Sequence, residues 1–239
     1  MKNSQLYILW FGTTLTSVVI LLNYFQQRRR KKKDEERKTE YLKCKSLSDF
    51  EELAKKSMMP HRFYYYDYKA GQGHTYQACR HYFDKQLRIM PRVLMDVSEI
   101  SLKTTIFGSI YESPILIATS ACHCLAHVDG EVATARAATE AQCIFTYNWT
   151  FSNMPEEEVL QTLVFVDTGI RSGTDVLKAL ALGARAVFIG RPILYGLASG
   201  GQDGVRRVLD ILKRELVYDM ACCGLTSIDQ INKDILYKH

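Results

Sequence analysis

Two apolar segments near the C-terminus, separated by a helix-like stretch, constrain the fold of this chain most. Residues 163–167 (LVFVD) end in a carboxylate, and residues 184–190 (ARAVFIG) form the second segment. Between them, Thr174 can cap a helix over residues 175–182, which Gly183 ends. Strand, helix and strand in this order are typical of the parallel unit of an α/β protein.

The same order occurs once more upstream. Residues 114–118 (PILIA) and 143–147 (CIFTY) are short apolar runs, and an alanine-rich helix is expected between them, over residues 129–141. Ser48 and Asp49 precede an apolar-periodic stretch and predict a short capped helix there. The last helix is indicated by apolar residues at helical spacing, namely Val205, Val208, Leu209, Leu212, Leu216 and Met220.

A turn that contains glycine and arginine follows each of the two C-terminal strands. The first turn runs from Asp167 through Gly169 to Arg171, and the second is Gly190-Arg191. Glycine lets backbone N–H groups approach an anion, and arginine adds positive charge. Because the loops after the last two strands of a (β/α)₈ barrel commonly hold a phosphate, we predict a phosphate site here. Tight turns with solvated arginines are the alternative.

An aspartic protease is a second alternative, because Asp167, Thr168 and Gly169 follow an apolar run. That chemistry needs two carboxylates that share a proton. The chain has a single such triplet, which a homodimer would have to double, and a helix is expected soon after it. The protease fold is all-β, so this interpretation ranks well below the phosphate site.

The N-terminus predicts a membrane anchor. Residues 6–25 are mostly apolar, long enough for the roughly 30 Å hydrocarbon core, and six basic residues follow at 28–33. Positive charge on this flank predicts a single-pass protein with its N-terminus out and its C-terminal domain cytosolic, in an unspecified organelle. A cleaved signal peptide would carry its charge before the apolar region, which is not the pattern here.

The charge and the cysteine content of the chain exclude several classes of protein. The net charge of +5 comes from 31 basic and 26 acidic residues, and without residues 28–33 the two nearly balance, so no nucleic-acid-binding face is indicated. The seven cysteines are irregularly spaced, which favours a reducing compartment over a disulfide framework. Cys122-His123-Cys124 has no second ligand pair, so buried side chains are expected there and no metal site.

Five segments closely resemble the FMN-dependent 2-hydroxy-acid oxidases, a family that includes glycolate oxidase and the L-lactate dehydrogenases. They are MPRVLMDVS at 90–98, TTIFG at 104–108, PILIA at 114–118, HVDGEVATARA at 127–137 and DTGIRSGTDVLKALALGA at 167–184. The resemblance extends over about residues 47–235. It implies a (β/α)₈ barrel with FMN at the carboxyl ends of the strands. The flavin takes two electrons when the substrate α-hydrogen is removed, and in oxidases passes them to oxygen.

The resemblance also implies roles for particular residues. Those that would hold the FMN phosphate are Asp167, Thr168, Gly169, Ile170, Arg171, Gly190 and Arg191. Those expected along the isoalloxazine ring are Ala118, Thr119, Ser120 and Ala121, with Asn148 near the flavin. Tyr68 matches the tyrosine that binds the substrate carboxylate. Two positions depart from the family, because the usual proline is Thr119 here and Thr168 replaces a glycine.

The middle of the barrel has no counterpart in the chain. A complete barrel takes roughly 250 residues, whereas Pro114 to Gly224 spans about 110, enough for about four strand–helix units. The family's third to sixth strands are missing, together with the histidine base, the arginine for the substrate carboxylate and the lysine near flavin N1. The histidines present lie in other contexts: His61, His74, His81, His123, His127 and His239. We therefore assign no catalytic residue.

The sequence thus predicts three parts: a transmembrane anchor (1–27), a basic linker (28–46) and an FMN-dependent hydroxy-acid dehydrogenase-like domain (47–239) with an incomplete barrel. By resemblance the domain would oxidise an (S)-2-hydroxy acid to a 2-oxo acid, with little or no activity in this chain. The alternative is a non-catalytic, membrane-anchored flavin- or phosphate-binding or regulatory fragment. Open strand edges pair readily, so a homo-oligomer is one possibility. An unstable fragment, a splice form and a faulty gene model also stay open.

Overall fold

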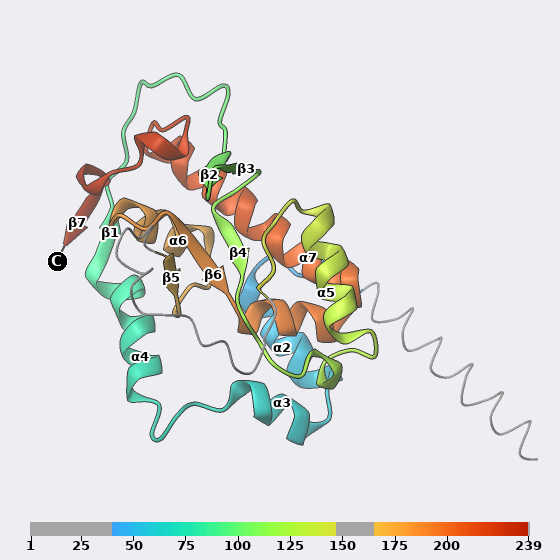
Figure 1. The fold of residues 1–239 in the computed structure, drawn as a ribbon. Helices are drawn as coiled ribbons and strands as arrows, with labels where there is room; N and C mark the ends of the chain where they lie inside the picture. The colour runs from blue at the N-terminus through green and yellow to red at the C-terminus, as the bar shows by residue number, and fades with distance from the viewer. Residues whose placement is uncertain (1–39, 147–164, 239) are drawn as a thin grey trace, which may run out of the picture. The chain divides into compact units, whose positions relative to one another are not determined.

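Three short parallel strands form the centre of the described structure (Figure 1). This computed structural model describes residues 40–146 and 165–238. β4 (Ile115–Ile117) and β5 (Phe165–Asp167) both pair with β6 (Ala186–Ile189), giving the order β4-β6-β5. Among these three strands β6 is the last in the sequence, and it lies between β4, which is the first, and β5. A closed barrel likewise pairs its last strand with its first. Over the described residues the sheet itself does not close.

The expected strand at 143–147 is present only as one parallel bridge, between Ile117 and Phe145. An incomplete (β/α)₈ barrel was expected. The structure shows a partial α/β fold whose parallel sheet does not close over the described residues. The helices packed against it are α5 (Gly130–Glu140), α6 (Gly173–Ala181) and α7 (Arg191–Cys222).

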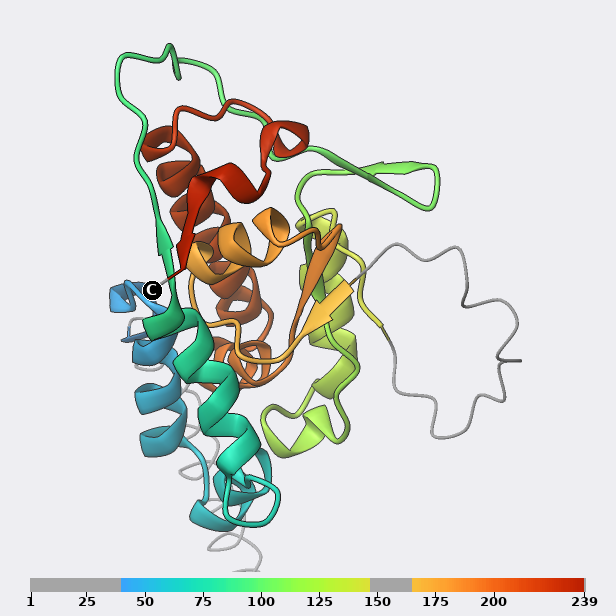
Figure 2. The same ribbon diagram turned by 90° about the vertical axis from the view of Figure 1, so that its left-hand side faces the viewer.

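Short helical segments and two antiparallel strand pairs complete the described chain. The helical segments are η1 (Tyr41–Lys43), α2 (Leu47–Ser57), α3 (Pro60–Asp67), α4 (His74–His81), η2 (Tyr82–Gln86), η3 (His123–Leu125), η5 (Ile228–Gln230) and η6 (Lys233–Ile235). The strand pairs are β1 (Leu87–Ile89) with β7 (Leu236–Lys238), and β2 (Thr104–Ile106) with β3 (Ser109–Tyr111). Figure 2 shows β1 and β7, which are far apart in the sequence, side by side.

The two faces of the parallel sheet are buried in different ways. Ile117 and Ile189 belong to the main core with the helices, whereas Leu116 and Ala186 form a smaller cluster with Ile106 of β2. This division follows from the two-residue period of a strand. The smaller cluster is completed by partly buried side chains, namely Tyr111, Ile144, Phe165 and Phe188.

Helix α7 contributes many of the buried apolar side chains of the main core. Every residue of its predicted stripe is fully buried, from Val205 to Met220. Burial of one such side chain stabilises a fold by about 1.5–3 kcal/mol, so this helix is a major source of stability. A kink at Gly200 and Gly201 divides it, and Gly201 has a φ of 59°, a conformation that favours glycine.

The start of the folded region differs from the predicted boundaries. The N-cap of helix α2 is Ser46, two residues before the predicted position. Asp49 completes a capping box, because its backbone N–H donates to the Ser46 hydroxyl and its side chain accepts from the Ser46 backbone. Tyr41 and Cys44 fall within the predicted linker but are buried. The ring of Tyr41 occupies the space that a Cβ at Gly200 would need. The packed chain therefore includes residues from Tyr41 onward.

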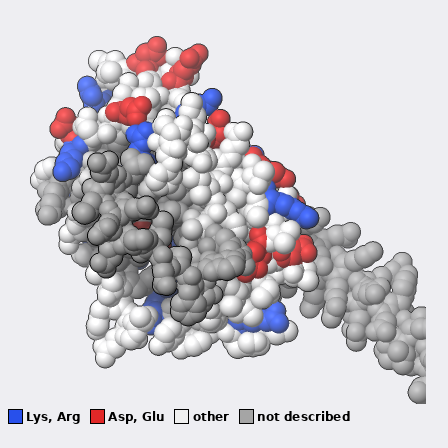
Figure 3. Space-filling model, viewed as in Figure 1, with Lys and Arg blue, Asp and Glu red and all other residues white. Residues whose placement is uncertain are grey.

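The predicted localisation requires a correction. Among residues 40–146 and 165–238, no helix combines the length and the apolar character that a membrane span requires. The structure therefore does not support the prediction of a single-pass protein with a cytosolic domain. The segment assigned as the anchor, residues 1–27, lies outside the described residues. On the described part of the face in Figure 3, acidic and basic side chains are interspersed, as on a solvated surface.

Two half-buried carboxylates join α6 to α7. Glu215 accepts a hydrogen bond from the Gly173 backbone at 2.8 Å, and Asp219 accepts one from the Thr174 hydroxyl at 2.5 Å. Burial is the main reason why the pKa of Glu215 and that of Asp219 are raised above the usual carboxyl range. Charging these groups therefore costs more in the folded chain than in the unfolded chain.

Replacing Glu215 by Gln should flatten the pH dependence of stability. In the native chain the contribution of Glu215 is most favourable below the ordinary glutamate pKa of about 4.3, and it falls as the pH rises through the raised folded pKa. Glutamine keeps an acceptor for Gly173 without the charge. Thermal unfolding between pH 4.5 and 8 should show a smaller loss of Tm in Glu215→Gln than in the native chain. Glu52→Gln, at an exposed position, is the control, and equal slopes in all three proteins would contradict the prediction.

Candidate cofactor site

A cavity of about 320 Å³ lies at the carboxyl ends of the three parallel strands. Its volume is within the range of small-molecule sites. Three loops line it. The loop after β4 contributes Ala118, Thr119 and Ser120. The end of β5 and the loop after it contribute Asp167, Thr168, Gly169, Ile170 and Arg171. The turn after β6 contributes Gly190 and Arg191. The two arginine turns predicted from the sequence therefore face one common hollow.

Three predicted site residues are not among those lining the cavity. Ala121 follows the lining residues but is not one of them. Asn148 lies outside the described residues. The Tyr68 side chain is 56% exposed and packs against Tyr64, with the ring centroids 5.7 Å apart. Tyr68 touches the site through its backbone, because its carbonyl oxygen accepts a hydrogen bond from Arg191 at 3.1 Å.

The loop after β5 has an unusual backbone. Thr168 has a φ of 98° and Gly169 a φ of 76°, so two successive residues are in the left-handed region. For a β-branched residue such as Thr168 this conformation is strained. Asp175 holds the end of the loop, since its Oδ2 accepts hydrogen bonds from the backbone N–H groups of Arg171 (2.8 Å) and Ser172 (3.1 Å). These two donors are therefore already engaged within the protein.

The loop after β6 leads straight into helix α7. Gly190 is the N-cap residue and provides no side-chain cap, and Pro192 lies in the first turn. The first N–H groups of a helix have no partner within the helix, and the helix dipole adds positive potential there. This end of α7 therefore favours an anion in the cavity beside it.

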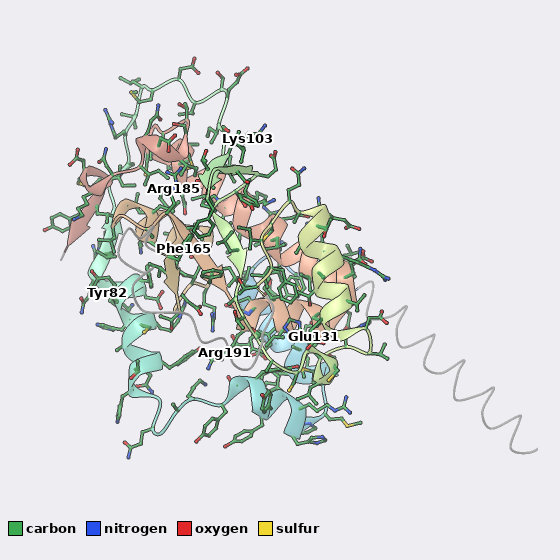
Figure 4. The ribbon with its side chains drawn as sticks, viewed as in Figure 1. Tyr82, Lys103, Glu131, Phe165, Arg185 and Arg191 are labelled. Carbon is green, nitrogen blue, oxygen red and sulfur yellow. The ribbon has the colours of Figure 1, made fainter. Side chains whose placement is uncertain are left out.

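Arg191 connects the cavity to α3 and the residues that follow it. Its Nε donates to the Tyr66 carbonyl at 2.9 Å, and its guanidinium lies 5.0 Å from the centre of the Tyr76 ring. Figure 4 shows Arg191 between the end of the sheet and α3. A guanidinium has five N–H donors, so these contacts orient the side chain and leave donors for a ligand. Arg171 donates from Nη1 to the carbonyl of Ile170 at 2.9 Å.

Asp167 is the acidic residue of the cavity lining. Although Asp167 keeps exposed surface, partial desolvation raises the pKa of its carboxyl above the usual range, opposed by a hydrogen bond from the Thr168 backbone and by the charge of Arg191. A carboxylate beside two arginines reduces the net positive charge of the cavity and can accept hydrogen bonds from hydroxyl groups of a ligand.

Residues outside the predicted set also shape the cavity. Phe188 and Leu194 line it, and Arg80 of α4 donates to the Gly169 carbonyl at 2.8 Å. Phe188 could have been found from the two-residue period of its strand. Nothing in the sequence near position 80 indicates Arg80, because its partner is 89 residues away.

The cysteine cluster differs from expectation. Cys122 and Cys124 are exposed, whereas small buried side chains were predicted, and His123 between them is fully buried and contacts the Thr134 hydroxyl at 2.9 Å. Within the described ranges, no three His, Cys, Asp or Glu side chains are grouped as a metal site. The protease alternative does not fit either, because Asp167 to Gly169 connect a parallel strand to a helix and not strands of an all-β fold.

A comparison with known protein families identifies the family of this chain. Residues 54–163 and 156–238 match the family model of the FMN-dependent dehydrogenases, and the chain therefore belongs to that family. FMN is the cofactor that this membership implies.

Relatives of known activity match a shorter stretch. The chain is 58% identical over 73 residues to 2-hydroxyacid oxidase 2 of Mus musculus, which is 30% of this chain and 21% of the relative. It is 54% identical over 83 residues to a peroxisomal (S)-2-hydroxyacid oxidase of Arabidopsis thaliana, which is 33% of this chain and 23% of the relative. The matched stretches thus span about a fifth of the length of these relatives.

Solved structures share the fold. An active mutant of (S)-mandelate dehydrogenase has a TM-score of 0.73 at 19% identity, covering 81% of this chain and 99% of the other. A mandelate oxidase mutant with (S)-mandelic acid has a TM-score of 0.71 at 22% identity, with coverages of 81% and 98%. At this level of identity the likeness establishes the fold alone.

Replacing Thr168 by Gly should stabilise the protein. Left-handed backbone costs a residue with a side chain roughly 1–2 kcal/mol, partly offset by the greater flexibility of glycine when unfolded. We expect the free energy of unfolding in urea to rise by about 1 kcal/mol in Thr168→Gly. Thr168→Ala, which keeps a Cβ, is the matched control and should gain less. An unchanged or lower stability of Thr168→Gly would show that the turn is not strained.

Proposed function

We propose that this chain binds FMN in the cavity at the carboxyl ends of β4, β5 and β6. The observation that carries the proposal is the position of Arg171 and Arg191, which line one hollow beside the uncapped start of α7. Guanidinium groups and a helix N-terminus are the donors that suit a phosphate dianion. The chemistry of the residues present therefore fits the phosphate end of FMN.

Each part of the cavity has a role in this proposal. Arg171 and Arg191 would bind the phosphate, and Asp167 would accept hydrogen bonds from the hydroxyl-bearing chain of the cofactor. Thr119 and Ser120 would contact the ring, and Phe188 and Leu194 would provide apolar surface. When bound, FMN supplies the two-electron acceptor for oxidation of a 2-hydroxy acid.

We propose further that this chain has little or no 2-hydroxy-acid oxidase activity. Among the described residues that line the cavity none is a histidine, and His123 is fully buried against Thr134. Oxidation of a 2-hydroxy acid requires a group that takes a proton, and loss of general-base catalysis alone costs about 10²–10⁴ in rate. The family model matches in two overlapping segments, residues 54–163 and 156–238, and a break of this kind supports the proposal that the middle of the barrel is missing. A non-catalytic flavin- or phosphate-binding role is the second candidate, favoured by the same lining.

Replacing Arg171 by Met should weaken FMN binding while leaving riboflavin binding nearly unchanged. Riboflavin lacks the phosphate, and a hydrogen bond to a charged group contributes about 1.5–3 kcal/mol, which corresponds to roughly 10–100-fold in affinity. Titration followed by flavin fluorescence measures both affinities. Arg206→Met, on the exposed side of α7, is the control. A wild-type protein that binds no FMN would overturn the proposal.

Purified protein saturated with FMN should not turn over glycolate, lactate or a longer 2-hydroxy acid. The expected rate is lower by about 10²–10⁴ than that of a complete family enzyme measured in parallel, because no histidine that could act as the base lines the described part of the cavity. Anaerobic bleaching of the flavin absorbance by substrate, followed in a stopped-flow instrument, tests this without assuming an electron acceptor. Bleaching at ordinary enzyme rates would contradict it.

A further inference from the structure

Helix α4 packs directly against the loop after β5. A Cβ at Gly169 would come within 3.2 Å of the Cys79 carbonyl oxygen and of the Phe83 ring, so the glycine permits this close approach. On the other side of the contact, the buried Lys178 of α6 donates from Nζ to the Phe83 carbonyl at 2.6 Å. The end of α4 and the start of η2 are thus fixed relative to the cavity loop.

Arg80 makes the polar part of this contact. Its Nη1 donates to the Gly169 carbonyl at 2.8 Å and lies 3.5 Å from Oδ2 of Asp175. The Asp175 side chain is only 5% exposed, and the same oxygen accepts the backbone N–H groups of Arg171 and Ser172. A nearly buried carboxylate needs a positive partner, and Arg80 provides it. Nη2 of Arg80 also lies 3.4 Å from the more exposed Asp84.

The hydrogen bond to Gly169 has a consequence for the cavity. In a trans peptide the C=O of one residue and the N–H of the next point in opposite directions. Because Arg80 draws the Gly169 carbonyl toward α4, the N–H of Ile170 is directed away from α4. Gly169 and Ile170 both line the cavity, so this orientation keeps a carbonyl acceptor from turning toward a bound anion.

We propose that Arg80 is a positioning residue for the phosphate end of the cofactor. It acts through the Gly169 peptide and through Asp175, and it does not itself line the cavity. The inference rests on the proposed function, since it assumes that a phosphate binds beside this loop. It extends the site to a helix that none of the predicted phosphate-binding motifs includes.

Arg185 offers a matched control. Its Nε donates to the Thr105 carbonyl at 2.9 Å, and its Nη1 lies 3.3 Å from Asp229, so it also combines one backbone carbonyl with one carboxylate. It is not among the residues that line the cavity. Arg185→Met therefore removes a similar set of contacts elsewhere in the fold.

Titration of Arg80→Met with FMN and with riboflavin tests the inference. We expect affinity for FMN to fall about 10-fold, affinity for riboflavin to stay within about 2-fold, and Arg185→Met to bind both flavins like the wild type. Arg80→Lys, which keeps the charge and one donor, should recover most of the FMN affinity. A loss of affinity for FMN without a loss of affinity for riboflavin is the result that a purely structural role of Arg80 would not produce.

The results that would contradict the role of Arg80 differ from those that would contradict FMN binding. Equal loss of both flavins in Arg80→Met, or unchanged FMN affinity, overturns the positioning role. If Arg80→Met melts below the assay temperature, the same comparison is made with Arg80→Lys and Arg80→Gln, and a Gln variant that binds FMN as well as the Lys variant overturns the role. A wild-type protein that binds neither flavin overturns the proposed function and this inference together.

Discussion

The pairing of β6 with both β4 and β5 is the interaction on which the rest of the structure depends. Each strand is only three or four residues long, so neither pairing would persist without the helices behind it. Because the pairing is parallel, the carboxyl ends of all three strands lie at one edge. Loops separated by up to about 70 residues in the sequence therefore meet around one cavity.

Much of this could be predicted from the sequence because it is determined locally. The apolar stripe of α7 follows from helical periodicity, and all of its residues are buried. The turns at 167–171 and 190–191 were predicted to share a site because parallel strands bring their ends together. The capped helix before β6 was also predicted, although its cap is Ser172 and not Thr174.

The rest depends on contacts between distant parts of the chain. Arg191 reaches the carbonyl of Tyr66, and Arg80 reaches that of Gly169, and no local spacing encodes either contact. Tyr68 is another example. Its motif matches that of the family tyrosine but does not predict that the ring is exposed. Cys122 is exposed on a left-handed turn, although the composition alone suggested burial.

The barrel architecture explains how cofactor binding can be separate from catalysis. In a (β/α)₈ barrel each strand brings its own loop to the same rim, so that the groups that hold a cofactor and the groups that transfer protons come from different strands. Here the cavity is lined by residues from β4, β5, β6 and the segments that follow them, and none of the described lining residues is a histidine. Binding energy at the phosphate lies remote from the reacting atoms. On the proposed function, the part of the barrel around β4, β5 and β6 can therefore bind a flavin without the strands that carry the proton acceptor in a complete barrel.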